Sequence, residues 1–186
     1  DPDQELIFVK SGGASLYEPF TRNDFAIIGP SDNPAGIEKD DTPAAAFRKI
    51  AVTGSPFASR SDSSGTHSRE KAIWTSAGID PSALQNYLQM GQSMSALLRC
   101  ARELRAYALT DLATFRQVGD PATQRVLLSG DPELENVYSV IVVKKGTSRQ
   151  NLIHARAFAE WLLSPPGQAS IAAFRIDGKV AFTPPR

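Results

Sequence analysis

The chain has 186 residues, of which 41% are hydrophobic and 22% charged, and its 20 basic and 20 acidic residues balance to a formal net charge of zero. This is an ordinary globular composition, with room for one domain or two small lobes. The balance of charge argues against a nucleic-acid groove, which needs a basic stripe. No apolar run reaches the roughly eighteen residues of a membrane-spanning helix.

In chain order, the first third of the sequence predicts short strands separated by helices. Residues 4–10 read as the end of a helix that "SGG" stops, and residues 24–29, "DFAIIG", as a buried strand with parallel neighbours. Residues 42–51 predict a helix with a threonine N-cap and proline at its first position. Residues 57–59 predict another short strand, and a helix begins within the polar stretch that follows.

The rest of the chain repeats this alternation of strands and helices. Its strongest strand is "VYSVIVV", which is nearly continuous and β-branched, and its last long helix is predicted to turn Leu152, Ile153, Ala157 and Trp161 inward. The alternation predicts an α/β fold with mainly parallel sheets. The predicted elements are helices over 80–90, 93–106 and 149–163 and strands over 106–111, 125–131 and 137–143.

The stretch "SRSDSSGTHSRE", residues 59–70, gathers the residue types that hold an anion. It lies between a strand and a helix, where α/β folds bind ligands. The first N–H groups of a helix have no intrahelical partner, and the helix dipole adds partial positive charge there. Hydroxyls, a glycine and an arginine fork complete an oxyanion cradle. The predicted anion-binding residues are Arg60, Ser61, Ser63, Ser64, Gly65 and Thr66.

The same stretch permits other interpretations. Any one of its serines can be only a helix N-cap. A serine hydrolase using Ser63 or Ser64 with His67 is disfavoured, because triads draw on separate segments and no Gly-x-Ser-x-Gly elbow is present. We therefore predict no enzyme and no catalytic residue. No metal site is predicted either, because two histidines and one cysteine lack ligand spacing.

Asp62 is the awkward member of this cluster, because a carboxylate repels an anion. In the favoured interpretation it pairs with Arg60 or accepts a backbone N–H, and so orients the loop. In the other interpretation it accepts a proton from a ligand such as hydrogen phosphate.

Several stretches together resemble one family. "SRSDSSGTHSREKAIW" is similar to the pattern "SRGDxSGTHxxExxxW" of tungstate-binding periplasmic proteins, the substrate-binding subunits of ABC importers. The similarity continues in "RNDFAIIGPSDNPAGI", "YLQMGQSM", "AYALTDLATF", "GDPELENVYSVIVV" and "FAEWLLSPPGQASIAAF". "RSDSSGT" also fits phosphate-binding proteins of the same transport class. His67, Glu70 and Trp74 belong to the tungstate pattern, which is therefore preferred.

The resemblance implies a type II periplasmic-binding-protein fold, with two α/β lobes joined by crossover strands at 24–29 and 137–143. Residues 1–35 would be a remnant of the first lobe, 36–136 the second lobe, and 137–186 the return to the first lobe. The family's Thr-Thr-Thr-Ser anion loop is not found in this sequence, so we expect an incomplete first lobe that exposes apolar surface. Ser61 stands where the family usually has glycine.

The resemblance also implies the function. The expected protein is an extracytoplasmic binding protein, periplasmic or extracellular and secreted or lipid-anchored, that captures tungstate or molybdate for a membrane ABC permease. It would be monomeric, need no cofactor and bind no nucleic acid. A phosphate-binding protein and a ligand-free interaction module are the alternatives. The residues implied to support the loop or line the cleft are Ser59, Asp62, His67, Gln92, Ser93, Thr110, Asp111 and Tyr138.

Overall fold

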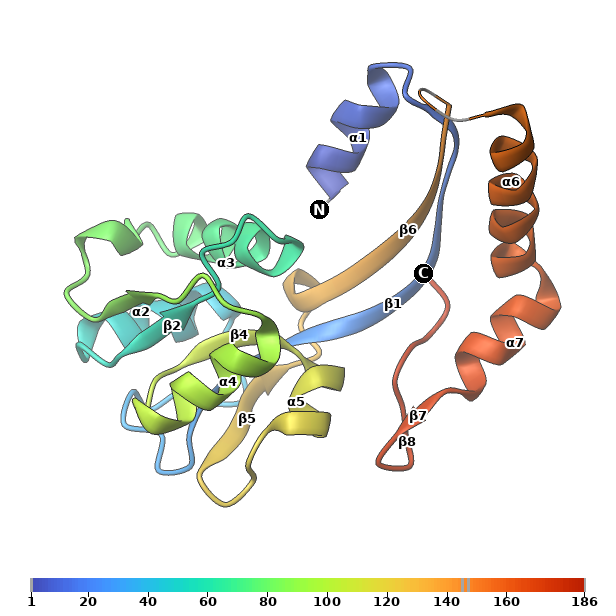
Figure 1. The fold of residues 1–186 in the computed structure, drawn as a ribbon. Coiled ribbons are helices and arrows are strands. Elements are labelled where there is room, and N and C mark those ends of the chain that lie inside the picture. The colour runs from blue at the N-terminus through green and yellow to red at the C-terminus, as the bar shows by residue number, and fades with distance from the viewer. Residues whose placement is uncertain (1, 145, 147, 186) are drawn as a thin grey trace. The chain divides into compact units, whose positions relative to one another are not determined.

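The computed structural model describes residues 2–144, 146 and 148–185, whose elements are drawn in Figure 1. The chain divides into two compact units. The central unit is Asp24–Glu135, and the terminal unit combines the residues up to Asn23 with those from Asn136 onward. Helices and strands alternate along most of the chain, and the predicted α/β class is confirmed.

The central unit contains most of the helices and strands. It begins with the second half of β1 (Ala14–Pro30), the strand that the two units share. Its helices are α2 (Pro43–Val52), α3 (Gly65–Ser76), α4 (Met94–Glu103) and α5 (Leu112–Val118), with 3-10 turns η1 (Pro81–Ala83) and η2 (Pro132–Leu134). Its other strands are β2 (Phe57–Ser59), β3 (Tyr87–Gln89), β4 (Ala108–Asp111) and β5 (Gln124–Ser129).

The second half of β1 is buried on both faces. Phe25 and Ile27 lie in one apolar cluster, whereas Ala26 and Ile28 lie in a second cluster that contains the apolar face of α4. Successive side chains of a strand point to opposite faces, so this stretch must be apolar throughout. This double burial explains the continuous run "FAII" in the sequence.

The predicted parallel pairing of residues 24–29 is wrong. β1 pairs antiparallel with β4, from Phe25↔Asp111 to Ile28↔Ala108, and antiparallel with β5. β2 and β3 form a parallel pair, whereas β7 (Arg175–Ile176) and β8 (Lys179–Val180) are antiparallel, so the described pairings are not mainly parallel. The apolar run at residues 25–28 indicates that the strand is buried on both faces. It does not indicate whether the neighbouring strands are parallel or antiparallel. Parallel neighbouring strands need a long crossover connection, which is usually a helix. β1 reaches the central unit directly from the terminal unit, so no helix of the central unit precedes it and sets its direction.

The predicted helix at 80–90 is also wrong beyond its first turn. Asp80 caps the 3-10 turn η1, as predicted for a helix start, but Tyr87–Gln89 then forms β3. β3 pairs with β2 in register Phe57↔Tyr87, and the Tyr87 ring stacks on Phe57 at a centroid distance of 6.1 Å. This tertiary pairing overrides the local helix preference.

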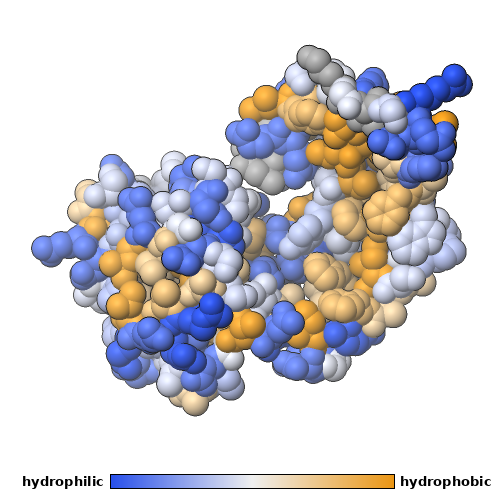
Figure 2. All heavy atoms as spheres, viewed as in Figure 1, coloured by the Kyte–Doolittle hydropathy of each residue, from blue (hydrophilic) through white to orange (hydrophobic). Residues whose placement is uncertain are grey.

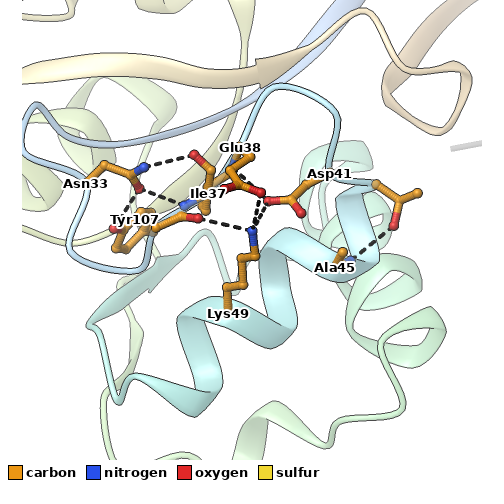
Figure 3. Close-up of polar contacts among 9 residues, drawn as sticks. Asn33, Ile37, Glu38, Asp41, Ala45, Lys49 and Tyr107 are labelled. Carbon is orange, nitrogen blue, oxygen red and sulfur yellow. Dashed lines mark hydrogen bonds and ion pairs between the residues drawn. The ribbon is translucent and has the colours of Figure 1, made fainter.

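The segment after β1 is held by polar contacts to α2 and to Tyr107, the residue before β4 (Figure 3). Lys49 of α2 donates to Asp41 at 2.7 Å and to the Gly36 carbonyl at 3.1 Å. The Tyr107 hydroxyl accepts from the Ala35 amide at 2.7 Å. The Tyr107 ring needs a glycine at position 29, since a Cβ there would lie 2.5 Å from the ring.

The terminal unit has few elements and a partly open apolar surface. Ile153 and Trp161 of α6 (Arg149–Leu163) are 53% and 46% exposed, and Ala157 is exposed as well, so the prediction that these side chains face inward is wrong. In the view of Figure 2, hydrophobic residues gather on this unit. Besides the first half of β1, its elements are α1 (Pro2–Lys10), β6 (Glu135–Val143), α6 (Arg149–Leu163), α7 (Pro165–Ala173), β7 (Arg175–Ile176) and β8 (Lys179–Val180).

β6 pairs with β1, and the helices α6 and α7 pack on each other. Among the described residues, none of the helices combines the length and the apolar character that crossing a bilayer requires.

Candidate functional site

The loop between β2 and α3, residues 60–64, has an unusual backbone. Ser61 and Ser63 adopt φ values of 45° and 60°. This left-handed conformation is costly for residues with a Cβ and is adopted freely by glycine. A positive φ at Ser61 therefore explains why the similar family pattern has glycine there. Strained residues of this kind cluster at functional sites.

The N-terminus of α3 presents free amide donors. Ser64 is the N-cap, and its Oγ accepts from the His67 amide at 3.4 Å. Gly65 and Thr66 are the first two residues of α3, and the backbone N–H of neither one donates a hydrogen bond to any residue that the structure describes. α3 is 12 residues long, so its dipole adds partial positive charge at this end. An anion placed here would receive hydrogen bonds that the protein itself leaves unmade.

Arg60 and Asp62 form an ion pair across the loop. Arg60 Nε donates to Asp62 Oδ2 at 2.9 Å, its Nη2 contacts the same oxygen, and Asp62 Oδ1 accepts from the Ser64 amide at 3.1 Å. Burial alone would raise the pKa of Asp62, but the hydrogen bonds from Ser64 and Arg60 outweigh it and hold the pKa at about 2. The favoured interpretation of Asp62 is confirmed in its contacts, whereas its effect on a ligand stays a prediction.

His67 supports the loop from the first turn of α3. Its Nδ1 accepts from the Ser63 amide at 3.1 Å, which requires a neutral ring with Nδ1 unprotonated. Burial lowers the pKa of His67, and the charges of Lys71 and Arg60 lower it further. Among the described contacts, none joins the ring to a serine hydroxyl, so the geometry gives the hydrolase alternative no support.

The base of the loop is held by a buried polar network that the sequence does not reveal. Ser59 is fully buried, and its Oγ accepts from the Ser61 amide at 3.2 Å and lies 2.9 Å from Tyr87 Oη. The same Tyr87 hydroxyl donates to Glu70 Oε1 at 2.7 Å. The sequence does indicate that Glu70 is buried, because it shares a helix face with Ile73 and Trp74 at spacings of three and four residues. No comparable pattern indicates that Tyr87 of β3 is its hydrogen-bond partner.

The described hydrogen bonds of the remaining predicted residues are made to residues outside this loop. Ser93 caps α4, with Oγ accepting from Ala96, and Asp111 caps α5, accepting from the Thr114 amide at 2.7 Å. Thr110 is fully buried and donates to the carbonyl of Asp111, while Gln92 is exposed. Tyr138 belongs to the terminal unit, where its hydroxyl accepts from Asn136 at 3.0 Å. Their roles toward a ligand stay predictions.

A family profile described as a PBP superfamily domain matches residues 2–166 of the chain. The chain belongs to the PBP superfamily. The family predicted from the sequence patterns, that of the periplasmic binding proteins, is thereby confirmed.

Individual relatives of this PBP chain carry more specific names. A Haloferax volcanii protein, named as an ABC transporter anion-binding protein, is 38% identical over 168 residues, which cover 87% of this chain and 49% of the relative. The tungstate-binding protein TupA of Peptoclostridium acidaminophilum is 32% identical over 182 residues, covering 95% of this chain and 63% of the relative. The chain thus spans about half to two thirds of the length of these curated relatives.

A solved structure agrees with the sequence relatives. The tungstate-binding protein TupA from Desulfovibrio alaskensis superposes on this PBP chain with a TM-score of 0.84 at 36% identity. The alignment covers 100% of this chain and 76% of that one. The periplasmic-binding-protein fold predicted from the sequence is therefore confirmed.

Proposed function

We propose that this PBP chain is an extracytoplasmic binding protein that captures a tetrahedral oxyanion, tungstate or molybdate, for uptake by an ABC permease. The observation that carries the proposal is the N-terminus of α3, where the free amides of Gly65 and Thr66 directly follow the loop that presents Arg60. The relatives named for tungstate and anion binding support the same ligand class.

The geometry favours a ligand that brings no proton. Both oxygens of Asp62 are engaged, one by Arg60 and the other by the Ser64 amide. With its pKa at about 2, the carboxyl is ionised at neutral pH and already holds its donors. A hydrogen phosphate would need a free acceptor for its proton, whereas tungstate and molybdate need donors only. We therefore prefer these dianions to the phosphate alternative.

The proposal makes the protein a carrier and not a catalyst. Ser64 Oγ is engaged in capping α3, and His67 Nδ1 in accepting from Ser63, so both groups have structural partners. The permease would be the partner at the membrane, and no cofactor is needed.

Calorimetric titration with tungstate, molybdate, sulfate and phosphate tests the proposal on the wild-type chain and on Asp62→Asn. Tungstate and molybdate are expected to bind with similar affinity and about 100-fold or more tightly than phosphate, because only phosphate leaves a proton without an acceptor. Tight phosphate binding that collapses in Asp62→Asn would show that the protein selects a protonated anion. Absence of binding by all four anions would refute the anion-binding function itself.

A further inference from the structure

Glu70 is a buried carboxyl beneath the anion loop that the proposed function does not use. It lies on the second turn of α3 and is only 1% exposed. Its Oε1 accepts from the Tyr87 hydroxyl at 2.7 Å, and that hydroxyl lies 2.9 Å from Ser59 Oγ. The carboxyl therefore connects helix α3 with β3 and with the end of β2, the strand that leads into the loop.

The contacts continue into the loop itself. The Ser59 hydroxyl and the Arg60 backbone amide both face the carboxyl closely enough to lower its pKa. Ser59 Oγ in turn accepts from the Ser61 amide, and the Ser59 carbonyl accepts from Met90 at 3.0 Å. The residues on either side of Arg60, and the backbone of Arg60, are thus all tied to Glu70 directly or through one hydroxyl.

Structural stability alone does not account for a carboxyl in this place. A buried ionisable group is costly relative to an apolar side chain of similar size, and the surrounding cluster of Phe57, Ile73 and Trp74 is apolar. Trp74 Nε1 is near enough to lower the pKa of Glu70, but it makes no hydrogen bond within the described residues. The hydrogen bonds that the carboxyl does make connect it, through Tyr87 and Ser59, to the loop.

We propose that Glu70 is a positioning residue, which fixes Ser59 and the Arg60 backbone in the geometry that anion binding requires. The proposal rests on the proposed function of the loop. Glu70 touches no ligand in this scheme, since its side chain points into the core and acts through Tyr87 and Ser59.

The proposal implies a pH dependence of a definite sign. Burial raises the pKa of Glu70 to about 7, against the lowering effect of hydrogen bonds from Tyr87, Ser59, the Arg60 amide and Trp74. Ionisation adds a buried negative charge near the anion, so the affinity should fall as the pH rises through about 7.

The groups around the loop whose pKa is shifted, Tyr87, Asp62 and His67, keep their charge as the pH rises through about 7. Tyr87, the titratable group that faces Glu70 from β3, has a raised pKa because of burial and because of Glu70 itself, so it stays neutral. Asp62, with a pKa of about 2, stays ionised. Burial, followed by the charge of Lys71, lowers the pKa of His67, so its ring is neutral at pH 7 and above.

Tungstate affinity measured by calorimetry from pH 6 to 8.5 tests the proposal on four chains. The wild type should lose about tenfold in affinity over this range, because the ionised carboxylate repels the dianion. Glu70→Gln, which mimics the protonated acid, should bind within about threefold of the wild type at pH 6 and show no loss at higher pH. Glu70→Ala should bind about tenfold more weakly than Glu70→Gln, or worse, at every pH, because the contacts of the carboxyl are lost. The control Ile73→Ala, on the same buried face of α3, should lower the melting temperature and keep the wild-type pH profile.

Amide hydrogen exchange of residues 60–64 without any anion separates this proposal from the function on which it rests. Exchange should be faster in Glu70→Ala and restored in Glu70→Gln, with Ile73→Ala unchanged. If the wild type binds no tungstate but the variants differ from it in exchange in this way, the proposed function fails and the positioning role stands. If Glu70→Ala exchanges and binds like the wild type, or if Glu70→Gln keeps the full pH dependence, the positioning role is overturned.

Discussion

Replacing Arg60 with alanine is expected to weaken tungstate binding by about 100-fold or more, which corresponds to about 2.7 kcal/mol. The guanidinium supplies charge-assisted hydrogen bonds, each typically worth about 1.5–3 kcal/mol. Its loss also leaves the Asp62 carboxylate without its cationic partner beside the anion. Calorimetric titration with tungstate measures the change. The tungstate affinity of Arg60→Lys should lie between those of the wild type and Arg60→Ala, because a lysine keeps the charge without the planar fork.

Arg105→Ala is the matched control for this experiment. Arg105 also pairs with an aspartate in the central unit, Asp32 at 2.6 Å, but its side chain is 64% exposed and lies outside the loop. Its removal should leave the tungstate affinity within about twofold of the wild-type value, since exposed ion pairs contribute little to stability. A loss of less than about threefold in Arg60→Ala, with the fold intact, would mean that the anion site has been placed wrongly.

The largest expected effect on stability comes from Phe47→Ala. Phe47 of α2 is fully buried, and its ring lies 4.4 Å from that of Trp74 and 5.0 Å from that of Phe57, centroid to centroid. Truncation removes a large apolar surface and leaves a cavity beside the rings of Phe57 and Trp74, so the unfolding free energy of the central unit should fall by about 3–5 kcal/mol. Urea denaturation followed by Trp74 fluorescence reports this unit, provided that the chain's second tryptophan, Trp161, is replaced by phenylalanine.

Val52→Ala is the control on the same helix. Val52 is 86% exposed, so its truncation should change the unfolding free energy by no more than about 0.5 kcal/mol. Similar losses in Phe47→Ala and Val52→Ala would show that the aromatic cluster does not hold α2 on the central unit.

Much of the fold could be predicted because local signals and tertiary structure agree. Thr42 and Pro43 start α2, residues 57–59 form β2, and residues 149–163 form α6, all as the sequence predicts. Where they disagree, the missing information is tertiary. The direction of β1 depends on which strands flank it, and Tyr87 enters a strand because β2 offers an edge next to it.

The candidate site divides in the same way. The residue types of the loop, a helix N-terminus and one arginine are local features, so composition and spacing indicate them. The left-handed backbone at Ser61 and Ser63 is visible in the sequence only through the resemblance, which has glycine at the first of these positions. The contact between Glu70 and Tyr87 joins residues 17 positions apart, and no sequence period encodes it.

The position of the bound anion is the central claim, and crystals grown with tungstate test it most directly, because tungsten scatters X-rays anomalously. We predict one strong anomalous peak within hydrogen-bonding distance of the Gly65 and Thr66 amides and the Arg60 guanidinium. A peak remote from the N-terminus of α3, in crystals of a chain that binds tungstate in solution, would contradict the assignment of the site.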